Sequence, residues 1–437
     1  MKNDFFNKVF RGDKGIWFIF MFLCMISVIE VFSATSQMSY ASGSFWSPIS
    51  SHCLHMLMGV GMVIVVHLMP CKWWKLLGPV LLLVSFGLLT FLIVSGKTVN
   101  GGARWLPIFG FTVQPSELAK LSCIIVVALL LSRLDTTDLR SSWKTFGWTM
   151  GITGACCVLI ALENLSTAGL LFLVVLLMTL LAGMPKRITL PIYGLGALAL
   201  GLLLAFFVMT PPKTMHWMAE NTPLHRVETW QNRIKGFVVV LPDNPSEYRI
   251  NDKNRQISHA LIAVASSGIV GVGPGNSIQR DFLSHADCDF IFAIILEELG
   301  LLGGIFVLLL YIALLVRVAK IARQCTSKFL TLLVMGCALM IVTQAFVHML
   351  ISVNMFPVTG QPLPLISRGG TSVVITCMYI GIILGVSYRI ESKGKGDVVS
   401  QIADESDDEE ETAALGTMTG IAETEPENEE AIVEYIK

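Results

Sequence analysis

The sequence predicts an all-α polytopic membrane protein with about ten transmembrane helices and one long extracytoplasmic loop between helices seven and eight. Three observations lead to this fold class. Of the 437 residues, 54% are hydrophobic and only 14% are charged, whereas soluble proteins carry about 25% charged residues. The apolar residues form runs long enough to cross a bilayer. Every second connection between these runs is rich in Lys and Arg.

The apolar runs define the ten predicted helices. The first run is long and lacks a small-residue cleavage site, which indicates a spanning helix rather than a signal peptide. The predicted spans are residues 16–34, 51–69, 76–95, 116–133, 145–162, 167–184, 188–211, 289–316, 329–353 and 371–388.

The distribution of basic residues predicts the orientation of these helices, because short cytoplasmic loops are enriched in Lys and Arg. Basic residues lie at the N-terminus and in alternate connections: Lys2, Lys8, Arg11 and Lys14, then Lys72 and Lys75, Arg133, Arg140 and Lys144, Lys186 and Arg187, Arg317, Lys320, Arg323 and Lys328, and Arg389, Lys393 and Lys395. Both termini are therefore expected in the cytoplasm. The long loop 212–288 then lies outside, and its short apolar segment 257–272 is predicted to be a re-entrant or interfacial helix.

The chain divides into three predicted parts: a cytoplasmic N-terminus (1–15), a ten-helix membrane domain (16–390) and an acidic cytoplasmic tail (391–437). From Asp397 to the end, the tail has 14 acidic residues and one base, Lys437, so it is predicted to be disordered. Nucleic-acid binding is not expected, because the basic residues sit in short loops at the membrane. The ten cysteines show neither CxxC nor metal-ligand spacing, and we expect them to pack between helices.

Two motifs flank the start of the fourth predicted helix. The segment Asn100–Trp105 combines glycines with Arg104, whose forked donor suits a phosphate or carboxylate; an aromatic and Arg membrane anchor is an equal alternative. The segment Gln114–Lys120 places Glu117 and Lys120 three residues apart on one helix face. An unpaired charge is costly in a membrane, so we expect an ion pair, either purely structural or lining a polar cavity.

A third motif joins the long loop to helix eight. Its glycine-rich part, residues 271–279, lacks the GK[ST] of a P-loop, so ATP use is not expected. Asp289 opens the predicted helix, where a carboxylate either caps the helix or acts as a general base beside a membrane-embedded substrate. If the preceding chain is extended, His285 and Asp287 converge on Asp289 and hold Mg²⁺ or Mn²⁺ or tune its pKa. Otherwise both are solvated loop residues.

The fourth motif, residues 356–372, connects helices nine and ten. It contains three prolines and three glycines, which break regular helix structure. Irregular backbone at membrane depth is tolerated only where it is buried in protein or lines a cavity. This segment is therefore the clearest indication of a site within the helix bundle.

Taken in order, NGGARW, QPSELAKL, GVGPGNSIQ, DFIFAIILEELG and FPVTGQPLPLISRGGTS resemble motifs of the SEDS family (shape, elongation, division, sporulation), whose members include FtsW and RodA. The resemblance extends from Ile16 to Arg389, and its last motif is closer to FtsW than to RodA. It implies a peptidoglycan glycosyltransferase in the bacterial cytoplasmic membrane, at the division septum.

The resemblance also implies a mechanism and partners. Asp289 matches the family's catalytic Asp, which is expected to deprotonate a sugar hydroxyl of lipid II. That hydroxyl then attacks the anomeric carbon of the donor glycan and displaces undecaprenyl pyrophosphate, which Arg104 and Arg368 are candidates to neutralise. The expected partners are a class B penicillin-binding transpeptidase and other division proteins. Further substrate-binding candidates are Glu117, Lys120, Asn276, Gln279 and Ser367.

This sequence departs from the family pattern at flanking positions. Ser284–Cys288 replaces Pro-Glu-x-His-Thr, Asn164 stands where the family has an acid, and Arg368 stands where many relatives have Tyr. These departures leave Asp289 unaffected. Two alternatives remain open: a lipid II flippase, which needs polar groups through the depth of the membrane, and a non-catalytic scaffold for division proteins, which the acidic tail suits.

Overall fold

The computed structural model of the protein describes residues 11–35, 47–95, 106–108, 111–221, 227–238, 250–251, 254–283 and 286–394. Its elements in chain order are α2 (Lys14–Ala34), α4 (Ser47–Leu68), α5 (Lys72–Ser95), β1 (Leu106–Ile108), β2 (Phe111–Val113), α6 (Pro115–Ser132), α7 (Leu139–Glu163), α8 (Leu165–Leu181), α9 (Lys186–Met209), α10 (Pro212–Asn221), α11 (Val227–Val238), α12 (Arg255–Ser266), the 3₁₀ helix η2 (Gln279–Asp281), α13 (Ile291–Gln324), α14 (Lys328–Ser352) and α15 (Thr371–Gly394).

Each of the ten predicted spans is a helix in the structure. Within the described residues, nine of them are long and apolar enough to cross a membrane, and the tenth, α8, is an apolar helix of 17 residues. The predicted fold class of an all-α polytopic membrane protein with about ten helices is therefore confirmed. The tail beyond residue 394, with its predicted disorder, lies outside the described residues.

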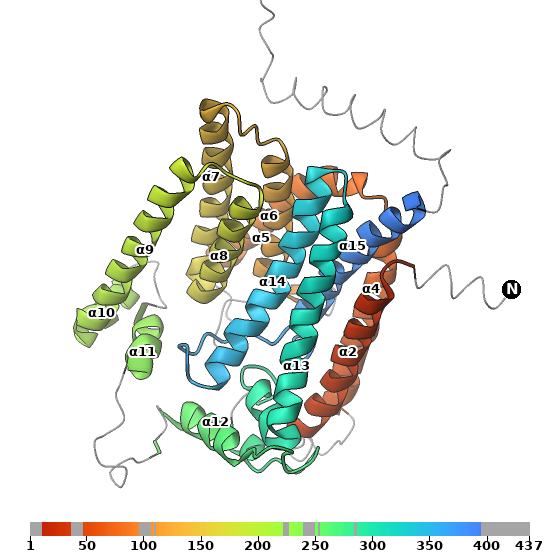
Figure 1. Ribbon diagram of the computed structural model, residues 1–437. Coiled ribbons are helices and arrows are strands. Elements are labelled where there is room, and N and C mark those ends of the chain that lie inside the picture. The colour runs from red at the N-terminus through yellow and green to blue at the C-terminus, as the bar shows by residue number, and fades with distance from the viewer. Residues whose placement is uncertain are drawn as a thin grey trace, which may run out of the picture. The chain divides into compact units, whose positions relative to one another are not determined.

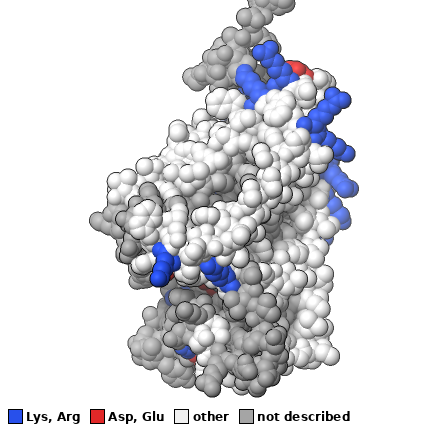
Figure 2. Space-filling model, turned by 90° about the vertical axis from the view of Figure 1, so that its left-hand side faces the viewer, with Lys and Arg blue, Asp and Glu red and all other residues white. Residues whose placement is uncertain are grey.

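Helix α6 lies at the centre of the membrane unit, where it packs against α5, α7, α8 and α14. Helix α13 contacts α2 and α14, and all three run side by side in Figure 1. Among the candidate spans that the structure describes, α6 is the most buried and α9 the least. Figure 2 shows Lys and Arg toward the upper end and along one edge of a face and further basic side chains lower down, with a wide uncharged surface between them. Such a surface suits contact with lipid.

The predicted loop 212–288 contains helices, which corrects the prediction of a long connection with a single short helix. Helix α12 occupies most of the predicted segment 257–272. Helices α10 and α11 are additional, and they bury Met215 and Val227 against Phe207 of α9. Their sequences are largely polar, so they carry no spanning signal and were not predicted.

Helix α13 is interrupted at Gly300, which has φ 71° and ψ −173°. A segment that we call the strap, residues 268–281, crosses this interruption and satisfies the backbone groups that it leaves without helical partners. The hydrogen bonds are Val272 N to Glu297 O (3.0 Å), Gly273 N to Glu298 O (2.8 Å), Leu301 N to Gly268 O (3.1 Å) and Leu302 N to Ile269 O (3.2 Å). The strap thus replaces helical hydrogen bonds at the break.

Candidate active site

Two segments that are far apart in the sequence meet just before α13: the turn 286–290 and the loop 363–370. The amide of Arg368 donates to the Asp287 carbonyl at 2.9 Å, and the Cys288 thiol donates to the Arg368 carbonyl at 2.6 Å. The buried Ser367 hydroxyl donates to the Cys288 carbonyl and accepts from the Leu363 amide, both at 2.7 Å. Ser367, a predicted substrate-binding residue, thus holds the two segments together.

An ion pair joins the same two segments through their side chains. The Arg368 Nη1 atom lies 3.2 Å from Oδ2 of Asp287, whose side chain is buried. The chain forms a turn over residues 286–289, so the extended geometry predicted for this stretch is wrong there, and so is the solvated-loop alternative for Asp287. His285 lies outside the described residues. Within the part of the chain that the structure describes, no group of three or more His, Cys, Asp or Glu side chains is placed to hold a metal ion.

Asp289 lies in this turn, two residues before α13 begins at Ile291. The N-cap residue is Phe290, so the predicted start of the helix at Asp289 is wrong by two residues and Asp289 is not the cap. Burial, followed by the negative charges of Asp287 and Asp289, raises the pKa of the Cys288 thiol, while Arg368 opposes that shift. A partly exposed carboxylate thus lies in a polar cluster with a second carboxylate and a guanidinium.

The predicted pair of Glu117 and Lys120 forms in the second polar cluster. Lys120 Nζ lies 2.8 Å from Glu117 Oε1, and both side chains are buried. Lys120 also donates to Gln344 Oε1 of α14 at 3.1 Å, and Gln344 donates to the Pro362 carbonyl at 2.9 Å. The ion pair therefore connects α6 and α14 to the irregular loop. Direct contact with substrate stays a prediction for these residues.

The position at which the sequence resemblance implies an acid is a helix cap here. Asn164 is the N-cap of α8, and its side-chain oxygen accepts from the Ser166 amide at 3.1 Å. Asn caps a helix about as well as Asp. One turn further, Thr167 accepts a hydrogen bond from Gln361 Nε2 at 2.5 Å. The substitution therefore keeps the local structure that supports the irregular loop.

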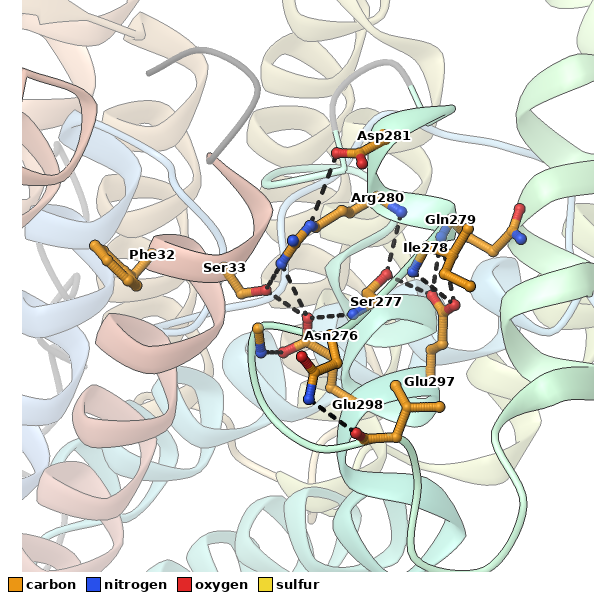
Figure 3. A network of polar contacts seen from close by, with 12 residues as sticks. Phe32, Ser33, Asn276, Ser277, Ile278, Gln279, Arg280, Asp281, Glu297 and Glu298 are labelled. Carbon is orange, nitrogen blue, oxygen red and sulfur yellow. Dashed lines mark hydrogen bonds and ion pairs between the residues drawn. The ribbon is translucent and has the colours of Figure 1, made fainter. Parts of the chain in front are cut away.

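Two adjacent buried carboxylates, Glu297 and Glu298, bind the strap (Figure 3). Glu297 accepts from Ser277 Oγ (2.5 Å), Ile278 N (3.1 Å) and Gln279 N (3.3 Å), and Glu298 accepts from Gly275 N (2.9 Å), Ser277 N (3.2 Å) and Ser33 Oγ. Arg280 Nη1 donates to Ser33 Oγ at 2.8 Å and lies 3.7 Å from Glu298 Oε1. We call Glu297, Glu298, Ser33 and Arg280 the clamp, because their hydrogen bonds fix the strap to α13 and to the end of α2.

The remaining predicted site residues have different surroundings. Asn276 donates to the Val272 carbonyl at 3.1 Å, and the Gln279 side chain bonds His259 at 2.8 Å, so both belong to the strap rather than to the Asp289 turn. Arg104 lies outside the described residues. The bonds of Glu297 and Glu298 to the strap were not predicted from the motifs, although two adjacent glutamates inside an apolar run indicate buried partners.

Comparison with known proteins places the chain among proteins of this architecture. The model of the cell cycle protein family that comprises FtsW, RodA and SpoVE matches residues 13–392. The chain belongs to this family. As a member of the FtsW/RodA/SpoVE family, it is 33% identical to the probable peptidoglycan glycosyltransferase FtsW of Halomonas elongata, with 83% of this chain and 87% of the relative covered. It is 32% identical to the protein of the same name from Marinobacter nauticus, over 86% and 90%.

Solved structures of the FtsW/RodA/SpoVE architecture resemble this fold. One comes from a study of the structural coordination of polymerization and crosslinking by a peptidoglycan synthase complex, with a TM-score of 0.63, 22% identity, and 87% of this chain and 98% of that chain covered. The crystal structure of RodA from Thermus thermophilus gives a TM-score of 0.59 at 22% identity over 86% and 96%. These structures support the helix arrangement. The family resemblance seen in the sequence motifs is confirmed by the family match.

Proposed function

We propose that the protein is a peptidoglycan glycosyltransferase that polymerises lipid II during cell division, with Asp289 as the general base. The relatives named peptidoglycan glycosyltransferase FtsW support the activity. The observation that carries the assignment of Asp289 is its place in the turn that Arg368 joins from 81 residues away. A carboxylate and a cation in one cluster are what this transfer needs.

In the proposed reaction, the Asp289 carboxylate takes the proton from a sugar hydroxyl of the acceptor lipid II. The hydroxyl oxygen forms a bond to the anomeric carbon of the donor glycan. The bond between that carbon and the pyrophosphate oxygen breaks, and undecaprenyl pyrophosphate leaves with the bonding electrons. Arg368, held in place by Asp287, stabilises the negative charge that develops on the leaving group.

The cation predicted at His285 and Asp287 stays a prediction. The Asp287 carboxylate is paired with Arg368, and a cation at this carboxylate would have to displace the guanidinium. The residues described at this position therefore fit a resident Mg²⁺ or Mn²⁺ poorly, and the proposed reaction contains no step through a metal ion.

The positions of the buried charged side chains favour an enzyme over a lipid II flippase. Glu117 and Lys120 lie in the first two turns of α6, and Gln344 and His348 lie in the last turns of α14, where Lys120 and Gln344 meet. These charged and amide side chains gather at one end of the helices, and the buried polar side chains nearer mid-depth or the other end, such as Ser85, Thr149 and Thr179, are uncharged hydroxyls. Moving a charged lipid headgroup across the bilayer needs charged or strongly polar groups along the whole depth.

Partner and location follow from the family and are part of the proposal. We infer a class B penicillin-binding transpeptidase as the main partner, because a solved structure of similar fold comes from a complex that coordinates polymerization and crosslinking. The apolar helices support a place in the bacterial cytoplasmic membrane. Cytoplasmic termini and recruitment to the septum with other division proteins are expected from the loop charges and the FtsW relatives.

The test is polymerisation of lipid II by the purified full-length protein with its transpeptidase partner, read as glycan strands on a gel. Asp289→Asn should abolish polymer formation while the protein keeps its normal membrane abundance and thermal unfolding temperature. Asp135→Asn, in the exposed connection between α6 and α7, is the matched control and should polymerise normally. Polymer from folded Asp289→Asn protein at the parent's rate would refute the assignment.

A further inference from the structure

Helix α2 carries three buried polar side chains on one face toward its C-terminal end: Ser27, Glu30 and Ser33. Residues three apart lie one above the other on a helix surface. Ser27 donates to the Ile366 carbonyl at 2.7 Å, and Ser33 donates to Glu298. Both carboxyl oxygens of Glu30 are buried and have no hydrogen-bond partner among the residues that the structure describes. Of the three side chains, the ionisable one is therefore the one that these residues leave without a partner.

The titratable and charged groups that face Glu30 come from three elements. From α13, the Glu298 carboxylate is close enough for its negative charge to act on Glu30. From the strap, Arg280 lies 3.7 Å from Glu298 Oε1 and offsets the charge of that carboxylate. From α4, the buried His52 is bonded to Ser27, one turn before Glu30. The cation that the strap supplies is thus committed to Glu298, in the network shown in Figure 3.

These surroundings determine which form of Glu30 the folded protein can hold. An isolated carboxylate is very costly to bury in a membrane bundle, and such a group takes up a proton instead. A second carboxylate nearby favours the neutral form further. Glu30 has both features, full burial and an anionic neighbour. As a neutral acid it can remain beside Glu298, whereas its anion would repel Glu298 and compete with it for Arg280.

We propose that Glu30 is a proton-binding site that controls how firmly the strap is held. Its proton is present while the clamp is closed. Loss of that proton places a second negative charge beside Glu298 and loosens the clamp. The proton passes between the carboxyl group and the surrounding water when the strap opens. This inference goes beyond the proposed glycosyl transfer and does not depend on it.

The direction of the pH effect follows from this release of a proton. Once the strap opens to water, a glutamate ionises near its ordinary pKa of about 4.3. While the strap is closed, Glu30 keeps its proton. Above about pH 4.3, each unit rise in pH therefore favours opening by up to about tenfold, until the closed form ionises as well. Acidic conditions keep the strap closed, and alkaline conditions loosen it.

The first test detects the proton itself. Infrared spectra of the full-length protein in detergent at neutral pH are compared between the parent and Glu30→Gln, because the carbonyl stretch of a protonated carboxyl is separate from that of a carboxylate. The difference spectrum should contain one protonated-carboxyl band. Glu228→Gln removes a carboxylate whose side chain is 42% exposed, and as the matched control it should give a carboxylate band. A carboxylate band for Glu30→Gln as well would overturn the proposal.

The second test measures how firmly the strap is held. Hydrogen exchange is followed at the amides of Gly275 and Ser277, which donate to Glu298, and is corrected for the intrinsic effect of pH on exchange. Between about pH 5 and about pH 7, protection in the parent should fall by up to about tenfold per pH unit. The fall should be largely absent in Glu30→Gln and unchanged in Glu228→Gln. Equal pH dependence in the parent and Glu30→Gln would overturn the proposal.

A neutral replacement should be tolerated at this position. Gln is uncharged and close to Glu in shape, so Glu30→Gln should unfold at the parent's temperature or above it. If this variant does not fold, Glu30→Met serves as the second neutral replacement in both measurements. Loss of folding in both variants would show that the bundle needs a negative charge here, and that result also overturns the proposal.

Discussion

Gly271 of the strap and Gly300 of α13 pass each other backbone to backbone. A Cβ on Gly271 would overlap the amide nitrogen of Gly300 and the carbonyl of Glu298, and a Cβ on Gly300 would overlap the carbonyl of Ile269. Both residues also have positive φ, at 80° and 71°. Two separate constraints, conformation and space, therefore require glycine at both positions.

We expect Gly271→Ala to lower the free energy of unfolding well beyond the roughly 1–2 kcal/mol that a left-handed backbone costs an alanine, because the backbones must also move apart. Gly183→Ala is the matched control: it has φ 78° and open space around its Cβ position, so it carries the conformational cost alone. Thermal unfolding in detergent compares the two variants. Equal losses would mean that the strap adjusts to the methyl group without cost.

Replacing Glu298 with Gln should loosen the strap without unfolding the bundle. The Gln side chain keeps one acceptor oxygen, so only one of the Gly275 and Ser277 amides keeps its partner atom, and Arg280 keeps Asp281 (3.7 Å) but loses the charge of Glu298. Hydrogen exchange at residues 275–279 should then become faster by about tenfold or more, since a bond to a charged group contributes about 1.5–3 kcal/mol. Exchange at the parent's rate in this segment would show that the charge of Glu298 is not needed to hold it.

The pair of Glu117 and Lys120 should show strong coupling in a double-mutant cycle. Either Glu117→Gln or Lys120→Met alone leaves a buried charge without its countercharge, for which a loss of about 3–5 kcal/mol is expected. The double variant should lose clearly less than the sum of the single losses. Thermal unfolding of the four proteins provides the measurement, and additive losses would contradict the energetic coupling of the pair.

The thiol of Cys288 should react slowly with alkylating reagents at mildly alkaline pH. Burial and two neighbouring carboxylates raise its pKa, so the reactive thiolate forms only at higher pH than the ordinary value of about 8.5. Asp287→Asn removes one of these charges and should increase the rate of alkylation at pH 8.5. The rate in the denatured protein serves as the reference. A folded protein that reacts as fast as the denatured one would refute the predicted shift.

The tail should be dispensable for polymerisation. Its charge predicts a disordered segment on the opposite side of the membrane from Asp289. Truncation after Gly396 should leave the rate of glycan synthesis by the purified protein unchanged. An inactive truncated protein with normal membrane abundance would contradict this expectation.

The spanning helices could be predicted from the sequence because the bilayer restricts which residues they may contain. A spanning helix must be apolar along its whole length, and even the 17-residue α8 shows this pattern. The pair of Glu117 and Lys120 was predictable for the same reason, because two unpaired charges there would be costly. Local patterns thus determine both the spans and the pairs within one helix.

The contacts between distant segments could not be predicted. Asp287 and Arg368 are 81 residues apart in the sequence. They meet only because the folded helices bring their two loops together, and no local sequence pattern indicates such a contact. The partners of Glu297 and Glu298 are mainly backbone amides of the strap, and amides are the same in every sequence. Helices α10 and α11, which pack against α9, were not predicted because their mixed polar composition shows no spanning pattern.

The interruption of α13 also sets an order of events during biosynthesis. The ribosome makes the strap before it makes Gly300. The carbonyls of Gly268 and Ile269 therefore have no hydrogen-bond donor from α13 until Leu301 and Leu302 have been synthesised. Glu297 and Glu298 are likewise synthesised after the strap amides that donate hydrogen bonds to them. The strap therefore completes its hydrogen bonds only when α13 has been made, and a nascent chain that stalls before that helix has every strap residue but none of these partners.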